Sequence, residues 1–273
     1  MQAGGSARQY FARARRFAVA HHDDYGRPWG RSFLRRHFKS SNYRHSAYSR
    51  DVANQSEFDK LAKEITDCHK CTRLVKWREK VSIEKRASYA NETYWGKPIA
   101  GFGDIRAKIL VMGLAPGAHG ANRTGRIFTG DRSGDWLFRA MHKAGLASQP
   151  ESIARNDGLK LANAWVSTAV RCAPPDNKPT PNERKKCANF LTRELELLSR
   201  VKVIICLGSF SLTAICDELQ IRPRPKFGHG VVIDHERYKI VCSYHPSQQN
   251  TFTGKLTEKM FDGVFKTAVK LAR

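Results

Sequence analysis

The stretch KILVMGLAPGAHGANRTGRIFTGDRSGDWLFRAMHKAGL, residues 108–146, joins an apolar run to an amphipathic segment through a glycine-rich turn. The run at 108–114 predicts a buried strand, and Ser133–Ala147 has helical spacing of apolar residues. Glycine-rich turns between a strand and a helix often hold phosphate. This turn is not G-x-G-x-x-G, and no Gly-Lys-Ser/Thr follows it, so neither a dinucleotide fingerprint nor a phosphate-binding lysine loop is indicated.

Three further apolar runs follow, and together the four runs predict a parallel sheet. They cover residues 108–114, 164–172, 201–208 and 238–246. All are short, nearly continuous and rich in β-branched residues, as in strands buried on both faces. Helical patterns alternate with them at Ser133–Ala147, Asn182–Arg200, Ser209–Gln220 and Thr257–Leu271. The alternation predicts βαβ units in an α/β fold with helices on both faces of the sheet.

Ligands in such sheets bind beyond the carboxyl ends of the strands. The first predicted strand ends in the glycine-rich turn, which contains His119, Asn122, Arg123 and Arg126. The second ends in RCAPPDNKPTPNERKKC, and the fourth ends in SYHPSQQNTFTGKLT. These three polar loops are therefore where a site is expected.

Charge indicates a polyanionic partner. The chain carries 48 Lys and Arg against 25 Asp and Glu, a formal net charge of +23. Nucleic acid is the commonest partner of so basic a protein. Residues 1–50 contain eleven Lys/Arg and two Asp, which predicts a poorly ordered basic arm before a domain at 51–273. A solvated arm, a nucleic-acid contact, a targeting segment and a start assigned too far upstream all stay open for it.

Seven cysteines without a secretory leader suggest a reducing compartment, and no run is long enough to span a membrane. Cys68 and Cys71 form C-H-K-C, and Cys172 and Cys187 flank the proline-rich loop. Four thiolates could hold zinc or an iron–sulfur cluster, and the alternative is that these cysteines are unrelated. Cys206, Cys216 and Cys242 lie in apolar segments and are expected in the core.

Three motifs together resemble the uracil-DNA glycosylase superfamily, and most closely its family 5, the iron–sulfur type B enzymes of prokaryotes. They are GLAPGAHGANRTGRIFTGD, VRCAPPDNKPTPNERKKC and SYHPSQQNTFTGKLT, and the resemblance runs from about Phe58 to the C-terminus. It implies a three-layer α/β/α sandwich around a four-stranded parallel sheet. It also implies a structural 4Fe–4S cluster on Cys68, Cys71, Cys172 and Cys187, which favours iron–sulfur over zinc.

The implied reaction is the first step of base excision repair: a damaged base is flipped out and its N-glycosidic bond is hydrolysed, leaving an abasic site. By resemblance, His245 hydrogen-bonds uracil O2 as negative charge develops there. Phe128 is the aromatic on which the base stacks, and Ala115 lies in the base pocket. Other families have a carboxylate just after the first motif glycine, and this chain has none. Asn122 is expected to position the water, with Asp131 as an alternative base.

The remaining site residues are assigned to base and DNA contacts. Ser167 and Thr168 stand where related families read the uracil edge with asparagine, so a broader substrate range, including hypoxanthine or xanthine, is expected. DNA contacts are assigned to His119, Arg123, Arg126, Ser247, Gln248, Gln249, Asn250 and Lys255. Phe252 is a further stacking candidate.

The expected partner is damaged DNA, double-stranded and also single-stranded, bound by a monomer in the prokaryotic cytoplasm at the nucleoid. Three rival functions stay open. The chain could be a non-catalytic lesion binder on the same fold, a view that the missing carboxylate favours. It could be an RNA-binding metalloprotein, which charge and cysteines alone support, or a phosphate-cradling hydrolase, which the missing lysine disfavours.

Overall fold

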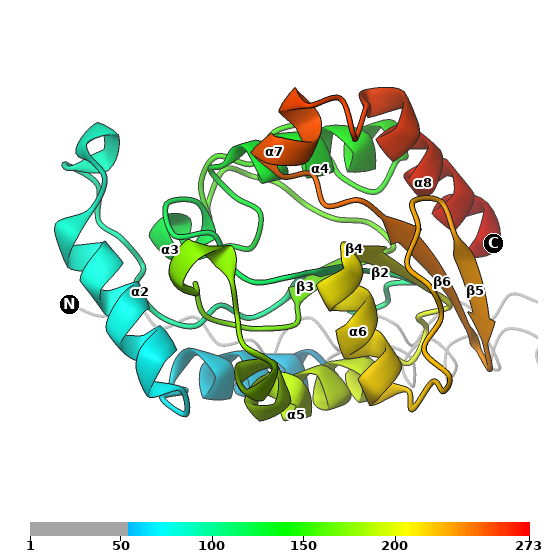
Figure 1. Cartoon of the computed structure of the whole chain (residues 1–273), viewed down its shortest axis with the longest axis horizontal. Helices are drawn as coiled ribbons and strands as arrows, with labels where there is room; N and C mark the ends of the chain where they lie inside the picture. Colours follow the sequence, from blue (N-terminus) through cyan, green and yellow to red (C-terminus); the bar gives the residue numbers. More distant parts are fainter. Residues whose placement is uncertain (1–53) are drawn as a thin grey trace, which may run out of the picture. The chain divides into compact units, whose positions relative to one another are not determined.

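The computed structural model describes residues 54–273 (Figure 1). The expectations for residues 1–50 lie outside the described part, so the predicted boundary at residue 50 stays a prediction. The described part of the chain begins with a helix over residues 54–66. The elements that follow are α2 (Thr72–Glu84), η1 (Ala87–Tyr89), β1 (Phe102–Gly103), β2 (Ile109–Gly113), α3 (Ala121–Thr124), α4 (Arg132–Lys143), β3 (Ala164–Thr168), η2 (Pro175–Asn177), α5 (Pro181–Leu197), β4 (Val203–Leu207), α6 (Ser209–Glu218), β5 (Val232–His235), β6 (Tyr238–Ser243), α7 (Gln248–Phe252) and α8 (Glu258–Leu271).

The sheet has the order β1-β3-β2-β4-β6-β5. Its four central strands are parallel, as the apolar runs predict. The two edge strands, β1 and β5, are antiparallel additions that the sequence analysis did not foresee. They escape detection because β1 has two residues and β5 is partly exposed, so neither contains a continuous apolar run. The predicted α/β fold is confirmed, with an extra short strand at each edge.

Helices cover both faces of this sheet, so that helices, sheet and helices form three layers (Figure 1). Alternate residues of β2 serve the two faces, as strand geometry requires. Ile109 and Val111 pack in the core that contains α4 and α8 residues, whereas Leu110 and Met112 pack in the core that contains α5 and α6 residues. Because both faces are buried, the strands read as continuous apolar runs instead of alternating ones.

Three of the long helices, α4, α5 and α8, start at side-chain caps that the sequence contains. Asp131 caps α4, Thr257 caps α8, and Thr180 caps α5 with Glu183 in a reciprocal capping box. Pro181 occupies the first position of α5, where its missing N–H costs no hydrogen bond. The four predicted helices are therefore confirmed to within a few residues at their ends. Among the helices of residues 54–273, none combines the length and apolar character that crossing a bilayer requires.

Candidate functional site at the carboxyl edge of the sheet

The carboxyl ends of the central strands lie at one edge of the sheet. Gly113 of β2 is level with Thr168 of β3, and Leu207 of β4 is level with Ser243 of β6. The loops that leave these ends therefore start side by side. They include the glycine-rich turn, the His-Pro-Ser turn after β6 and the loop before α5, which are the three segments that the sequence analysis singled out.

Two rings meet at this edge. The Phe128 ring and the His245 imidazole lie 5.9 Å apart between centroids, with 31° between their planes. Phe128 has a φ of 54°, a left-handed conformation that bulky residues rarely adopt. Such strain is found at sites where the surrounding structure needs a particular side-chain position. The structure therefore brings together two residues that the sequence assigned to the base and to its leaving charge.

Glycine makes room for this pair. A Cβ on Gly113 would lie 2.7 Å from Phe128 Cζ and 3.2 Å from Thr168 Cγ2. Gly208, with a φ of 93°, follows β4 on the other side, where a Cβ would lie 3.6 Å from His245 Cβ. The aromatic ring thus rests against the backbone at the end of β2, which only glycine permits. Ala115, two residues further on, packs against the cluster that contains Cys71, Cys172 and Cys187.

His245 is held through its backbone and has an unengaged ring. Asn250 Nδ2 donates to the His245 carbonyl over 2.9 Å, and the Ser247 hydroxyl accepts from the Asn250 amide at the start of α7. Within residues 54–273 the His245 imidazole makes no hydrogen bond. Burial lowers the pKa of His245 to about 4, so the ring is neutral at physiological pH. A neutral imidazole has one N–H to donate and carries no charge of its own before a ligand arrives.

The Asp131 carboxylate lies against the glycine-rich turn. One oxygen, Oδ1, accepts from the Gly134 amide over 3.0 Å as the cap of α4. The other, Oδ2, would be 1.9 Å from a Cβ on Gly120 and 3.0 Å from one on Gly117. Burial raises the pKa of Asp131, and the hydrogen bond from Gly134 opposes that shift. A carboxylate with a raised pKa and one oxygen facing the turn is suited to accept a proton from water.

Asn122 is fully buried in α3 and faces α2. Its Nδ2 donates to the Arg78 carbonyl over 3.2 Å, while its Oδ1 accepts no hydrogen bond within the described residues. A buried acceptor of this kind normally has a water or a ligand as its partner. The amide therefore ties the turn to α2 and keeps one acceptor available.

The basic side chains of the turn are engaged inside the protein. Arg126 is buried, pairs with Asp157 over 2.6 Å, and donates to Ser152 and Thr129. Arg123 donates to the carbonyls of His119 and Gly130, pairs with Glu92, and stacks on Tyr89. These bonds shape the loop that carries Phe128. They speak against the expected phosphate contacts of Arg123 and Arg126, because few of their donors remain free.

His119 is half-buried and lies 3.1 Å from the Tyr94 hydroxyl. Burial, together with the charges of Arg86 and Arg123, lowers the pKa of His119. A neutral ring bonded to a tyrosine is poorly suited to phosphate, so the expected DNA contact of His119 also finds no support in this geometry.

Ser167 and Thr168 point to opposite faces of the sheet, as neighbours on a strand must. Ser167 is fully buried on the α5 side, donates to Glu194 Oε2 over 2.6 Å, and accepts from Arg171. Thr168 lies on the Phe128 side, but its hydroxyl donates to the Val170 carbonyl. The geometry therefore corrects the expectation that Ser167 reads the base. Arg171 and Glu194 also form a buried ion pair on this side, for which no local sequence pattern gives a signal.

Three of the four expected cluster ligands, Cys71, Cys172 and Cys187, are buried together. Cys68 packs against the neighbouring cluster of Leu61, Ile65 and Phe190, and Arg78 Nη1 donates both to the Cys68 carbonyl and to Cys172 Sγ. Arg78 is buried there, with Nη1 3.1 Å from Cys172 Sγ and its Nε unpaired. Across residues 54–273, no group of three or more His, Cys, Asp or Glu is arranged as a metal site. The donor chemistry still fits a thiolate-bound cluster, because a buried guanidinium would offset part of its negative charge.

The turn after β6 presents polar and aromatic side chains to solvent. Gln248 and Gln249 are exposed on α7. Phe252 at the end of α7 is 67% exposed, with the Arg132 guanidinium 4.4 Å from its ring. Lys255 is exposed and lies 5.0 Å from the Tyr244 ring. An exposed aromatic ring beside cations is suited to stacking on bases and pairing with phosphate.

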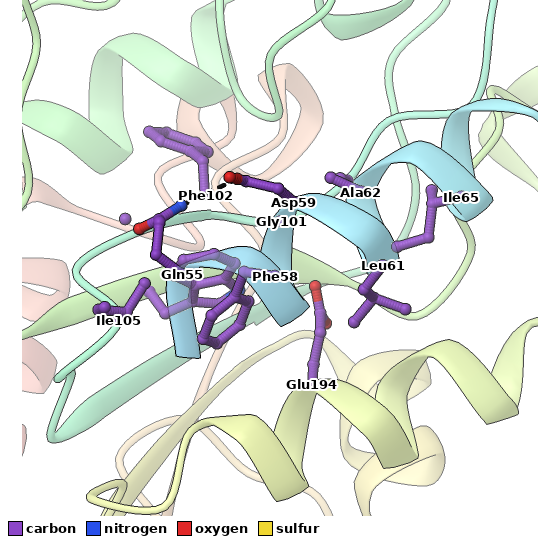
Figure 2. Close-up of a pocket in the computed structure, with 13 residues that line it drawn as sticks. Gln55, Phe58, Asp59, Leu61, Ala62, Ile65, Gly101, Phe102, Ile105 and Glu194 are labelled. Atoms are coloured by element: carbon purple, nitrogen blue, oxygen red, sulfur yellow. Dashed lines mark hydrogen bonds between the residues drawn. The ribbon is translucent and has the colours of Figure 1, made fainter. Parts of the chain in front are cut away.

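A separate cavity of about 210 Å³ lies under the 54–66 helix (Figure 2). Its lining includes Phe58, Gly101, Trp165 and Glu194. Figure 2 shows the Glu194 carboxylate directed toward this helix. Glu194 is already engaged by Arg171 and Ser167, and none of the residues expected to bind base or DNA lines the cavity. It is therefore not the base site.

Comparison with known proteins gives one consistent result. The family model for the "Uracil DNA glycosylase superfamily" matches residues 100–268. The chain is 48% identical over 211 residues to a "Type-5 uracil-DNA glycosylase" of Thermus thermophilus, which covers 76% of this chain and 95% of that protein. It is 47% identical over 217 residues to one of Mycobacterium tuberculosis, covering 76% and 79%. A "Type-4 uracil-DNA glycosylase" of Archaeoglobus fulgidus is 29% identical over 199 residues, covering 69% and 81%.

Proposed function

Because this chain belongs to the uracil-DNA glycosylase superfamily, it is a hydrolase that excises uracil from DNA in repair, and we propose that the residues at the carboxyl edge of its sheet carry out the excision. The observation that carries this proposal is the pairing of Phe128 and His245, 5.9 Å apart against Gly113 and Gly208. It supports a site in which an aromatic ring and a hydrogen-bond donor lie side by side. A purely DNA-binding function is not favoured by the relatives, which are named as glycosylases.

In this proposal the flipped base stacks on Phe128. The fixed backbone of the loop holds the ring, because Arg126 and Arg123 bind the loop from within. Stacking of a base on an aromatic ring is worth about 1–3 kcal/mol. The Phe128 ring, 6% exposed, is therefore fixed in position before the base arrives.

His245 then stabilises the leaving group. As the bond between C1′ and N1 lengthens, negative charge grows on uracil O2. The neutral imidazole donates its N–H to that oxygen, and the hydrogen bond strengthens as the charge develops. Asn250 keeps the ring in position through the His245 carbonyl. We assign Asn250 to positioning for this reason.

Asp131 receives the proton of the attacking water, and Asn122 Oδ1 accepts a hydrogen bond from a bound water. The support is the Asp131 oxygen that faces Gly117 and Gly120, and the unpartnered acceptor on Asn122. The carboxylate that other families place after the first glycine would thus be replaced by one eighteen residues after Gly113, brought back by the fold. The product is an abasic site, with no covalent intermediate on the protein.

DNA contacts fall to the turn after β6. We assign Gln248, Gln249 and Lys255 to the backbone and the vacated stack, with Phe252 as a stacking surface, because these side chains are exposed. Ser247 acts through its cap of α7. Double-stranded and single-stranded DNA would both fit such an exposed contact. The chain would act as one copy per site, in a prokaryotic cytoplasm at the nucleoid.

The substrate range is proposed to include hypoxanthine and xanthine. No side-chain amide stands at the end of β3, since Ser167 faces α5 and the Thr168 hydroxyl binds Val170. A site that reads the base edge with few side chains rejects other deaminated bases less strongly.

Cys68, Cys71, Cys172 and Cys187 are proposed to hold a 4Fe–4S cluster. When bound it would cross-link the segment between the 54–66 helix and α2 to the segment after β3 and to α5, and excision needs no electron from it. The same thiols would accept zinc, which metal analysis distinguishes.

The test is single-turnover excision from a labelled duplex with one U·G pair. We expect wild-type protein to produce abasic sites and His245→Ala to lose the rate by on the order of 100-fold. His142→Ala is the matched control, because His142 is an exposed histidine on α4. Tight binding to uracil-containing DNA without any abasic product would overturn the proposal in favour of a lesion reader. The same assay with hypoxanthine tests the substrate range.

A further inference from the structure

A groove of about 660 Å³ runs between α5 and α6, away from the residues assigned to catalysis. Its lining comes from the first half of α5, the end of α6, the segment that follows α6, and Ala169 after β3. These helices cover the face of the sheet opposite α4 and α8 (Figure 1). The groove contains neither Phe128 nor His245, so the excision site does not account for it.

The groove has an apolar floor and a cationic rim. Ala169, Leu191 and Ala214 are buried apolar residues of the floor. The charged lining residues are Arg184, Lys185, Arg222, Arg224, Asp217 and Glu218, four cations against two anions, which leaves a formal charge of +2. The groove therefore favours an anion that also carries an apolar group.

Three of the cations are already oriented by one carboxylate. Asp217 pairs with Arg184 over 2.6 Å, with Arg224 over 2.6 Å and with Arg222 over 3.0 Å. Burial raises the pKa of Asp217, but the hydrogen bonds from the three arginines outweigh burial and hold it below its usual range. One carboxylate cannot balance three guanidinium groups, and the Arg224 and Arg184 forks keep donors for a second anion. Lys185 is exposed and makes no ion pair within residues 54–273.

We propose that this groove binds an acidic peptide segment of a partner protein, with an apolar side chain on the floor and carboxylates on the rim. Charge complementarity on a cation-rich chain favours an acidic partner. An apolar side chain gains burial on Leu191 and the two alanines, which phosphates of a nucleic-acid backbone would not. A duplex presents its phosphates on a convex surface, whereas this floor lies between two helices.

The test measures fluorescence anisotropy of a fluorescein-labelled peptide, Asp-Asp-Glu-Asp-Leu-Phe-Asp-Glu. The peptide with every acid changed to its amide, and a labelled ten-nucleotide oligothymidine, are the comparison probes. Arg184→Ala with Arg224→Ala removes the fork donors, and Lys185→Glu changes only an exposed side chain. Lys259→Ala with Lys266→Ala on α8 is the matched control, because both lysines are exposed there.

We expect saturable binding of the acidic peptide that weakens by about tenfold or more in the double arginine variant and severalfold in Lys185→Glu. The amide peptide should bind far more weakly, and the lysine control should match wild type. Excision of uracil, measured in parallel, should be unchanged in every variant, which also reports that the fold is intact. The proposal is overturned if the acidic peptide does not bind, if the amide peptide binds equally, or if only oligothymidine binding depends on the arginines.

Discussion

Because Asp131 lies against the glycine-rich turn, we expect the substitution Gly120→Ala to lower both the stability of the protein and its excision rate. A methyl group there would stand 1.9 Å from Asp131 Oδ2, where ordinary contact needs about 3.4 Å, so the carboxylate must retreat by roughly 1.5 Å (3.4 minus 1.9). The 3.0 Å cap bond from the Gly134 amide to Oδ1 cannot survive a shift of that size.

The expected loss for Gly120→Ala combines two effects. Loss of the cap costs about 1 kcal/mol, and overpacking costs about 1–3 kcal/mol. We therefore expect the free energy of unfolding to fall by roughly 2–4 kcal/mol. If Asp131 receives the proton of the attacking water, a displacement of this size should also slow single-turnover excision on the order of 100-fold.

Substitutions at two other glycines serve as comparisons with smaller expected effects. Gly117→Ala brings its methyl only to 3.0 Å from the same oxygen and should give a smaller loss in both measurements. Gly263→Ala in α8 meets nothing within 4 Å and should stabilise the helix by about 0.5–1 kcal/mol without affecting excision. Urea unfolding and single-turnover excision are measured for all three. If Gly120→Ala retained wild-type stability and rate, the assigned position of Asp131 would be wrong.

Three more predictions follow from the site. Because the pKa of His245 is lowered to about 4, its neutral form persists well below pH 6.5. In Asp131→Asn, where no carboxylate base titrates, the residual excision rate should have its acidic midpoint near pH 4, and a midpoint near 6.5 in that variant would contradict neutral His245 as the donor. Phe128→Leu should reduce excision by the stacking energy of about 1–3 kcal/mol, which is about fivefold to about 150-fold. Phe138→Leu, a buried control among the same core residues, should affect mainly the melting temperature; equal rates in the two variants would remove Phe128 from the site. Cys187→Ser should lose most bound iron and sulfide in elemental analysis, whereas Cys216→Ser, buried in the other core, should retain them; full iron content in Cys187→Ser, or zinc in the wild type, would refute the cluster assignment.

Much of the fold is encoded locally. The continuous apolar runs at 108–114 and 201–208 could be read as doubly buried strands because helices cover both faces of the sheet. Asp131, Thr180 and Thr257 mark helix starts through hydrogen bonds to amides three residues ahead, so each cap is visible within a few residues of sequence. Phe128 and His245 could be proposed because each lies in a long motif at a strand end.

The rest depended on contacts between residues that are distant in sequence. No local pattern distinguishes an arginine that reaches DNA from Arg126, whose partner Asp157 is 31 residues away, or shows that Ser167 binds Glu194. Asp131 Oδ2 faces the glycine-rich turn only because the fold brings Gly117 and Gly120 against it. The sequence by itself determined the layers, the helix starts and the motif residues, because periodicity and capping are local. Only the tertiary structure decided which polar groups face the site, since burial and hydrogen-bond partners arise from packing across the sheet.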